Sequence, residues 1–179
     1  MKTIIFSFLA IVGINYLSIY LGKGFVYAQQ ASAQAQTLNV SPVIPAFVFV
    51  DPFTGKDFTP ASLPSEVVRM FFFYDPSCDH CQHAAESVAK AADKLKNVHL
   101  TWISKPQTSP ELIAKFRDTY FGKVRMNVHF VNGKGPNPYF GDIVAMPCVF
   151  IYGCKDQFVQ RFMREEITGE NLARFALCQ

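Results

Sequence analysis

The stretch FFFYDPSCDHCQHAAESVAKAADKL, residues 71–95, places two cysteines three positions apart where an apolar run gives way to a helical pattern. Residues 67–74 are almost continuously apolar, which is typical of a strand that is buried on both faces. From Asp79 onward, apolar residues recur every three or four positions to the end of the stretch, and this spacing predicts an amphipathic helix. Cys78 and Cys81 therefore lie at a turn from a buried strand into a helix.

Strands and helices alternate along the rest of the chain. A small hairpin is expected at 47–58, before the apolar strand. After the first helix, the pattern predicts a strand at 98–104, a helix from Ser109-Pro110 to about 121–122, a short strand at 126–131, a hairpin at 148–163 and a last helix at 168–177. This order predicts an α/β fold, with a central mixed β-sheet flanked by helices on both faces and an N-terminal β-hairpin extension.

The position of each cysteine in the helix indicates its role. Cys78 lies at or just before the first turn, where unpaired N–H groups and a partial positive charge stabilise a thiolate, the reactive form of cysteine. Cys81, one turn further in, is expected to be more buried and within reach for a disulfide. Cys78 is therefore the expected nucleophile toward a target disulfide, and Cys81 resolves the mixed disulfide. A purely structural disulfide explains this placement poorly, because so short a loop constrains the unfolded chain little.

A buried strand, the motif Asp-Pro-Ser-Cys-Asp-His-Cys at 75–81, an amphipathic helix and a later Met146-Pro147 before a hairpin resemble the thioredoxin-like superfamily. The similarity is greatest to its exported TlpA/ResA-like thiol–disulfide oxidoreductases and covers roughly residues 44–178. This resemblance implies a thioredoxin fold. It also implies an enzyme that exchanges disulfides through its cysteines alone, with no organic cofactor and no metal.

The same resemblance implies where a substrate binds. Pro147 matches a cis-proline that lies beside the active-site cysteines in this superfamily. The backbone of Met146 is then expected to pair with an extended substrate peptide. Tyr74 and Pro76 are expected to complete the substrate-binding groove next to Cys78.

The sequence departs from the superfamily pattern at two positions near the cysteines. Ser77 stands where a tryptophan often precedes the first cysteine, and Phe72 takes the place of a buried acid that relays protons in thioredoxins. The proton acceptor for Cys81 must then be another group. Asp79 is the first candidate, because ResA-like proteins carry a glutamate at the matching place, and Asp75 is the second. Either carboxylate can also be a solvated acid that the helix N-terminus favours.

His80 precedes the resolving cysteine, as in oxidising members of the superfamily such as DsbA. An imidazolium near the Cys78 thiolate stabilises the reduced form and raises the reduction potential. The negative charge of Asp79 acts in the opposite direction. These opposed effects predict a potential between those of thioredoxin and the strong oxidants, and they leave the direction of electron flow open.

Two other functions compete with disulfide exchange. Cys78, His80, Cys81 and His83 are possible ligands of a copper or other metal chaperone with a thioredoxin fold, although such chaperones space their cysteines one residue wider. A structural zinc site needs two further ligands from elsewhere. A peroxiredoxin-like antioxidant protein places threonine or serine three residues before its reactive cysteine, where this chain has Asp75.

The three remaining cysteines have separate interpretations. Cys148 follows Pro147 in a strand and is interpreted as a buried apolar residue rather than a third redox thiol. The strand after Pro147 runs away from the active site, so Cys154 is expected at the far tip of the hairpin. The next strand returns and the last helix runs away again, which brings Cys178 to that same end. This geometry predicts a structural disulfide between Cys154 and Cys178.

The N-terminal part of the chain predicts export. Residues 1–28 are a signal peptide or an N-terminal membrane anchor, with the apolar run at 4–21 as the possible membrane tether. Residues 29–43 are expected to form a flexible linker, and residues 44–179 the thioredoxin-like domain. The expected location is the periplasm or cell envelope, an oxidising environment in which disulfides persist.

Composition and location together define the expected partners. The 17 basic and 14 acidic residues give a net charge of +3 without a basic block, and this balance does not favour nucleic-acid binding. The expected partners are the thiols and disulfides of extracytoplasmic proteins. A separate upstream redox partner must recycle the cysteine pair.

Overall fold

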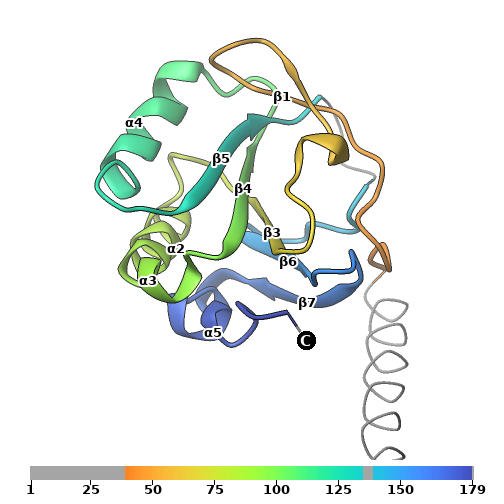
Figure 1. Cartoon of the computed structure of the whole chain (residues 1–179). Helices are drawn as coiled ribbons and strands as arrows, with labels where there is room; N and C mark the ends of the chain where they lie inside the picture. Colours follow the sequence, from red (N-terminus) through yellow and green to blue (C-terminus); the bar gives the residue numbers. More distant parts are fainter. Residues whose placement is uncertain (1–38, 135–138, 179) are drawn as a thin grey trace, which may run out of the picture.

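The computed structural model describes residues 39–134 and 139–178, so the predicted signal peptide or anchor at 1–28 lies outside the described residues. Within the described residues, seven strands form one mixed sheet in the order β2-β1-β5-β4-β3-β6-β7 (Figure 1). Their bounds are β1 Phe49–Val50, β2 Asp57–Phe58, β3 Val68–Phe73, β4 Val98–Ser104, β5 Asn127–Asn132, β6 Cys148–Tyr152 and β7 Phe158–Met163. Strands β3, β4 and β5 are parallel, and the other neighbouring pairs are antiparallel. The predicted mixed sheet and N-terminal hairpin are confirmed.

The helices follow the predicted order with two differences in length. Their bounds are α2 Asp79–Lys90, α3 Ala92–Leu95, α4 Pro110–Tyr120 and α5 Gly169–Ala173, with short 3-10 helices η1 Pro60–Ser62 and η2 Arg164–Glu166. The first predicted helix is interrupted at Ala91, and the last ends at Ala173 rather than at 177. No helix in the two described ranges is long and apolar enough to cross a membrane.

The two faces of the sheet are covered by different kinds of structure. One face buries side chains of α2, α3, α4 and α5, which lie together on one side of the sheet in Figure 1. The opposite face packs against residues 40–63 and 139–143, which contain no α-helix. The expectation of helices on both faces is therefore corrected. Because β3, β4 and β5 follow each other in one direction across the sheet, right-handed connections put α2 and α4 on the same side.

The folded part of the described chain includes residues that were expected to belong to the flexible linker. Val40 is buried on the non-helical face of the sheet and bridges to Gly141. The Ser41 N–H donates a hydrogen bond to the Phe140 carbonyl at 3.3 Å. The expected linker at 29–43 is thus too long at its C-terminal end, because residues 39–43 pack along the domain.

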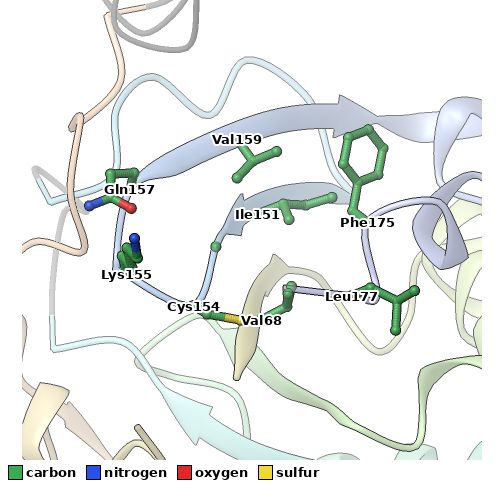
Figure 2. A pocket seen from close by; sticks show the side chains of 9 residues that line it. Val68, Ile151, Cys154, Lys155, Gln157, Val159, Phe175 and Leu177 are labelled. Carbon is green, nitrogen blue, oxygen red and sulfur yellow. The ribbon is translucent and has the colours of Figure 1, made fainter. Parts of the chain in front are cut away.

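A disulfide joins Cys154 to Cys178, with their Cα atoms 5.5 Å apart. Cys148 begins β6, and the disulfide lies just beyond the opposite end of this strand. This position agrees with the prediction from the directions of the strands and the last helix. Apolar side chains from β6, β7 and the C-terminal segment surround a cavity of about 100 Å³ beside it (Figure 2). The disulfide therefore attaches the segment after α5 to the hairpin between β6 and β7.

Helix α5 packs closely against α2 at its first residue. The Gly169 N–H donates to Ser87 Oγ at 3.0 Å. A Cβ atom on Gly169 would meet the Ser87 carbonyl oxygen and the Ala91 Cβ. A glycine is needed here because any side chain would push α5 away from α2.

Candidate active site

Cys78 is the N-cap residue of α2 and is partly exposed. Its backbone is extended, with φ −87° and ψ 123°, and its carbonyl accepts the Gln82 N–H at 3.0 Å. Its own N–H donates to the Asp75 carbonyl at 3.1 Å, which closes the turn after β3. Cys78 and Cys81 both carry free thiols in this structure. The expected nucleophile is therefore partly accessible at the N-terminal end of a helix.

Cys81 lies one turn further along α2 and is fully buried. Burial raises the pKa of its thiol to about 12, and the nearby Cys78 and the negative charge of Asp75 act in the same direction. The backbone N–H of Asp75 donates a hydrogen bond to Cys81 Sγ at 3.4 Å and opposes this rise. The buried position suits a thiol that reacts only with a partner held next to it.

The Asp75 carboxylate accepts three hydrogen bonds. Oδ1 accepts the Ser77 hydroxyl at 2.6 Å and the Ser77 N–H at 3.0 Å, and Oδ2 accepts Lys105 Nζ at 3.0 Å. The Ser77 hydroxyl is the main cause of an Asp75 pKa below its usual range. The carboxylate is therefore ionised at neutral pH. Asp79, the first candidate for the proton acceptor of Cys81, is exposed at the start of α2, whereas the main chain of Asp75 contacts Cys81 and the charge of Asp75 acts on it.

Tyr74 does not lie in a substrate groove, which corrects the sequence-based assignment. Its side chain is fully buried, with its ring 4.8 Å from that of Phe116 and 5.3 Å from that of Trp102. The side chain belongs to the core because Tyr74 continues the alternation of β3 onto the helical face of the sheet. Pro76 is also buried, although it lines a cavity beside Ser77.

The peptide bond between Met146 and Pro147 is cis, as the resemblance implied. Strand β6 pairs with β3 so that Cys148 faces Phe73, which places Pro147 beside the residues that lead into the cysteine turn. The Pro147 carbonyl accepts the N–H of Arg164 at 2.8 Å. Met146 is partly exposed and lines a cavity of about 190 Å³ at this edge of the sheet. The backbone expected to receive a substrate thus lies next to the end of β3, from which the chain continues into the cysteine turn.

Cys148 itself is separated from the cysteine pair by the sheet. It is fully buried among the side chains of the non-helical face, whereas Cys81 belongs to the helical face. Burial raises the pKa of the Cys148 thiol to about 12. These observations agree with its interpretation as a buried apolar residue.

His80 lies on the exposed side of the turn next to Cys78. Its Nδ1 is 3.5 Å from Glu165 Oε1, and both side chains are largely exposed. We expect His80→Ala to lower the reduction potential of the cysteine pair by tens of millivolts. The reason is that an imidazolium near Cys78 favours the reduced, thiolate form. For this couple, about 30 mV corresponds to 1.4 kcal/mol. A glutathione redox titration measures the change, and His83→Ala, on the same helix, is the matched control. Equal potentials in all three proteins would show that His80 has no part in setting the potential.

The described residues contain no group of three or more histidine, cysteine or acidic side chains arranged to hold a metal ion. His80 is directed toward Glu165, and His83 is exposed. The donors near the cysteines are thus not gathered into one site.

Comparison with solved structures identifies the fold. The chain is similar to the thioredoxin domain of a thiol-disulfide oxidoreductase from Bacteroides vulgatus, with 14% identity, a TM-score of 0.56, and coverage of 77% of this chain and 98% of that one. It is also similar to a secreted disulfide oxidoreductase of Mycobacterium tuberculosis homologous to Escherichia coli DsbE (18% identity, TM-score 0.55, coverage 73% and 93%). A third match is ScoI of Arabidopsis thaliana with copper bound (16% identity, TM-score 0.54, coverage 73% and 94%). No protein-family model matches the sequence, and no curated protein is significantly similar to it.

The fold is therefore that of the thioredoxin-like proteins, as expected from the sequence. The turn between β3 and α2, with Cys78 partly exposed and Cys81 buried, is the candidate active site of this fold.

Proposed function

We propose that this chain is a thiol–disulfide oxidoreductase that acts through Cys78 and Cys81. The observation that carries the proposal is the pairing of a partly exposed free thiol at the N-cap of α2 with a buried free thiol one turn later. Nucleophilic thiols need access and a favourable electrostatic position, whereas resolving thiols need proximity and protection. The cysteine turn supplies both conditions within four residues of chain.

The reaction proceeds in two exchange steps. The Cys78 thiolate attacks one sulfur of a substrate disulfide, so that a Cys78–substrate disulfide forms and one substrate thiolate leaves. Cys81 then loses its proton and attacks Cys78 Sγ, which forms the Cys78–Cys81 disulfide and releases the second substrate thiolate. The two thiolates take up protons, and two electrons have passed from the protein pair to the substrate. The same steps in reverse oxidise a substrate dithiol.

The proposed substrates are extracytoplasmic proteins, received as an extended segment along Met146 and Pro147. Support comes from the position of this backbone beside the cysteine turn and from the exposed Val144 (71% exposed), an apolar side chain next to it. The predicted export signal and the similarity to a secreted disulfide oxidoreductase favour the periplasm or cell envelope. An upstream redox partner recycles the pair.

Two cysteine variants test the assignment of roles. Cys78→Ala is expected to abolish disulfide exchange with a model protein disulfide such as that of insulin. Cys81→Ala is expected to retain the first step and accumulate a stable mixed disulfide with the substrate, because the resolving thiol is gone. Non-reducing electrophoresis and mass spectrometry detect that adduct. A Cys81→Ala protein that traps nothing and keeps full turnover contradicts the proposed roles.

A redox titration separates disulfide exchange from metal binding. The purified chain is equilibrated in glutathione buffers, and the state of Cys78 and Cys81 is read by thiol alkylation. A reversible two-electron transition supports the proposal, and its midpoint decides between a reductant and an oxidant. Absence of such a transition, together with tight copper binding, would instead favour the copper chaperone function suggested by the similarity to ScoI.

A further inference from the structure

Asp75 is the residue that contacts both cysteines of the candidate active site. Its carbonyl accepts the Cys78 N–H at 3.1 Å, and its own N–H donates to Cys81 Sγ at 3.4 Å. The main chain of one residue thus fixes the start of α2 and directs a hydrogen-bond donor at the buried sulfur. A donor at this position stabilises Cys81 when it carries negative charge, as it does at the moment of attack.

The Asp75 side chain holds this main chain in place. Oδ1 accepts both the N–H and the hydroxyl of Ser77, which closes a tight turn over residues 75–77. Oδ2 accepts Lys105 Nζ, and Lys105 directly follows β4, the strand next to β3. The side chain of Asp75 is 27% exposed and that of Lys105 is 48% exposed, so solvent only partly screens the pair. The turn that carries the cysteines is therefore tied to the neighbouring strand.

The charge of Asp75 has a second effect on the same sulfur. The negative charge of Asp75 opposes formation of the Cys81 thiolate. Lys105 pairs with that carboxylate, and its positive charge is expected to offset part of this effect. The other groups that act on Cys81 are Cys78, from the N-cap of α2, and Tyr74, whose buried hydroxyl has no hydrogen-bond partner among the described residues. His80 and Glu165 pair with each other at the exposed side of the turn. Asp75, paired with Lys105, is thus the ionised group whose charge acts on the resolving thiol.

We propose that Asp75, held by Lys105 and Ser77, is the positioning residue of the resolving step: it aims its amide at Cys81 and sets how readily Cys81 attacks the mixed disulfide. This inference rests on the proposed function. In the resolving step the Cys81 S–H bond is broken, a Cys81–Cys78 bond forms and the Cys78–substrate bond breaks. The departing substrate thiolate takes up a proton through solvent, so protons and electrons balance. Asp75 is ionised and already accepts three hydrogen bonds, so it acts by position and charge and not as the base.

A single-turnover reaction with the disulfide dithiobis(nitrobenzoate) separates the two steps. Each step releases one coloured thiolate: the first when Cys78 attacks the reagent, and the second when Cys81 resolves the Cys78 adduct. Stopped-flow absorbance therefore gives the rate of each step across a range of pH. The sample is the full-length protein with Cys78 and Cys81 reduced and the Cys154–Cys178 disulfide intact. Cys148 adds no early phase because it is fully buried.

Three variants make the test specific. Asp75→Ala is expected to slow the second phase at least about tenfold, since it removes the acceptor that holds the turn and weakens a hydrogen bond to a developing charge. Asp75→Asn keeps an acceptor for Ser77 but removes the negative charge. The rate of its second phase is expected to recover from the loss seen in Asp75→Ala, and the pH dependence of this rate is expected to shift to lower pH. Lys105→Met removes the positive charge that pairs with Asp75 and is expected to shift the pH dependence of the second phase to higher pH. These opposite shifts are not produced by a purely structural role.

The outcomes separate this inference from the proposed function. Asp118→Asn removes an equal charge from the surface ion pair with Arg117 and is expected to behave like the native chain. If the native chain shows two phases and Asp75→Asn and Lys105→Met leave the second phase and its pH profile unchanged, the role of Asp75 is refuted while the proposed function stands. If the native chain releases no second thiolate and forms no Cys78–Cys81 disulfide, both fail together.

Discussion

Replacing Cys154 and Cys178 with serine is expected to lower the free energy of unfolding by about 3 kcal/mol. The disulfide joins residues 24 positions apart, and a cross-link that closes a loop of this length reduces the entropy of the unfolded chain by about that amount. In the folded chain it attaches the segment after α5, where Phe175 and Leu177 line the cavity shown in Figure 2. The loss of order is expected to be largest in this segment.

Chemical denaturation of the oxidised proteins, followed by the fluorescence of the buried Trp102, measures this effect. The single variants Cys154→Ser and Cys178→Ser are expected to lose as much stability as the double variant, because either one removes the bond. A Cys78→Ala/Cys81→Ala double variant is the matched control. It removes the other cysteine pair, which spans only a short loop, and is expected to lose much less. Equal stability of the native chain and the Cys154→Ser/Cys178→Ser protein would contradict the prediction.

The strands and the cysteine turn could be predicted from the sequence because local patterns determine them. The segment 98–104 is a strand with the expected bounds, and the expected hairpin at 148–163 consists of strands 148–152 and 158–163, since each is an apolar or alternating run between turn residues. The disulfide between Cys154 and Cys178 followed from the directions of the last two strands and the last helix. Such inferences need only the order of elements along the chain.

Other features depend on how distant segments meet, and the sequence pattern does not contain that information. Tyr74 lies at the end of an apolar run that lacks a regular alternation of apolar and polar residues. The sequence therefore does not indicate which face of the sheet its side chain joins, and only the fold shows that its ring points into the core. Asp75 and Asp79 are both acids beside the cysteines, and only the turn reveals which one adjoins Cys81. Val40 belongs to a segment without periodicity, and its burial depends on Gly141, about a hundred positions away.

The placing of the four α-helices of the described residues on one side of the sheet has the same origin. It depends on the spatial order of β3, β4 and β5, which apolar periodicity does not determine. The consequence is a non-helical face covered by hairpin and loop residues, including Phe47, Phe58 and Phe140. This face also buries polar side chains, and one of them is expected to make the stability of the fold depend on pH.

His99, on β4, is the polar side chain in question. It is 4% exposed, and its ring stacks on those of Phe58 and His129, at centroid distances of 6.5 and 6.1 Å. Neither ring nitrogen has a hydrogen-bond partner among the described residues. Burial, followed by the nearby His129 and Arg69, lowers the pKa of His99 to about 4. The folded chain therefore holds His99 in its neutral form.

The stability of the chain is expected to fall by up to about 3 kcal/mol through His99 alone as the pH drops from about 6.5 to about 4. Above this window both states are neutral at His99. Within it, the unfolded chain takes up a proton and the folded chain does not, so unfolding becomes more favourable until the folded state also protonates near pH 4. Because His99 packs under Phe58, the loss is expected to loosen β1 and β2 first.

Denaturant unfolding at a series of pH values tests this expectation with His99→Leu, which removes the titrating ring and its two unpartnered nitrogens. The difference in unfolding free energy between this variant and the native chain is expected to grow in favour of the variant by about 3 kcal/mol from pH 7 to pH 4. Carboxylate protonation is common to both proteins and cancels in the difference. His83→Leu removes an exposed histidine and is expected to follow the native chain. If the unfolding free energies of the native and His99→Leu proteins change in parallel with pH, His99 has the same pKa in the folded and unfolded states, and the prediction is wrong.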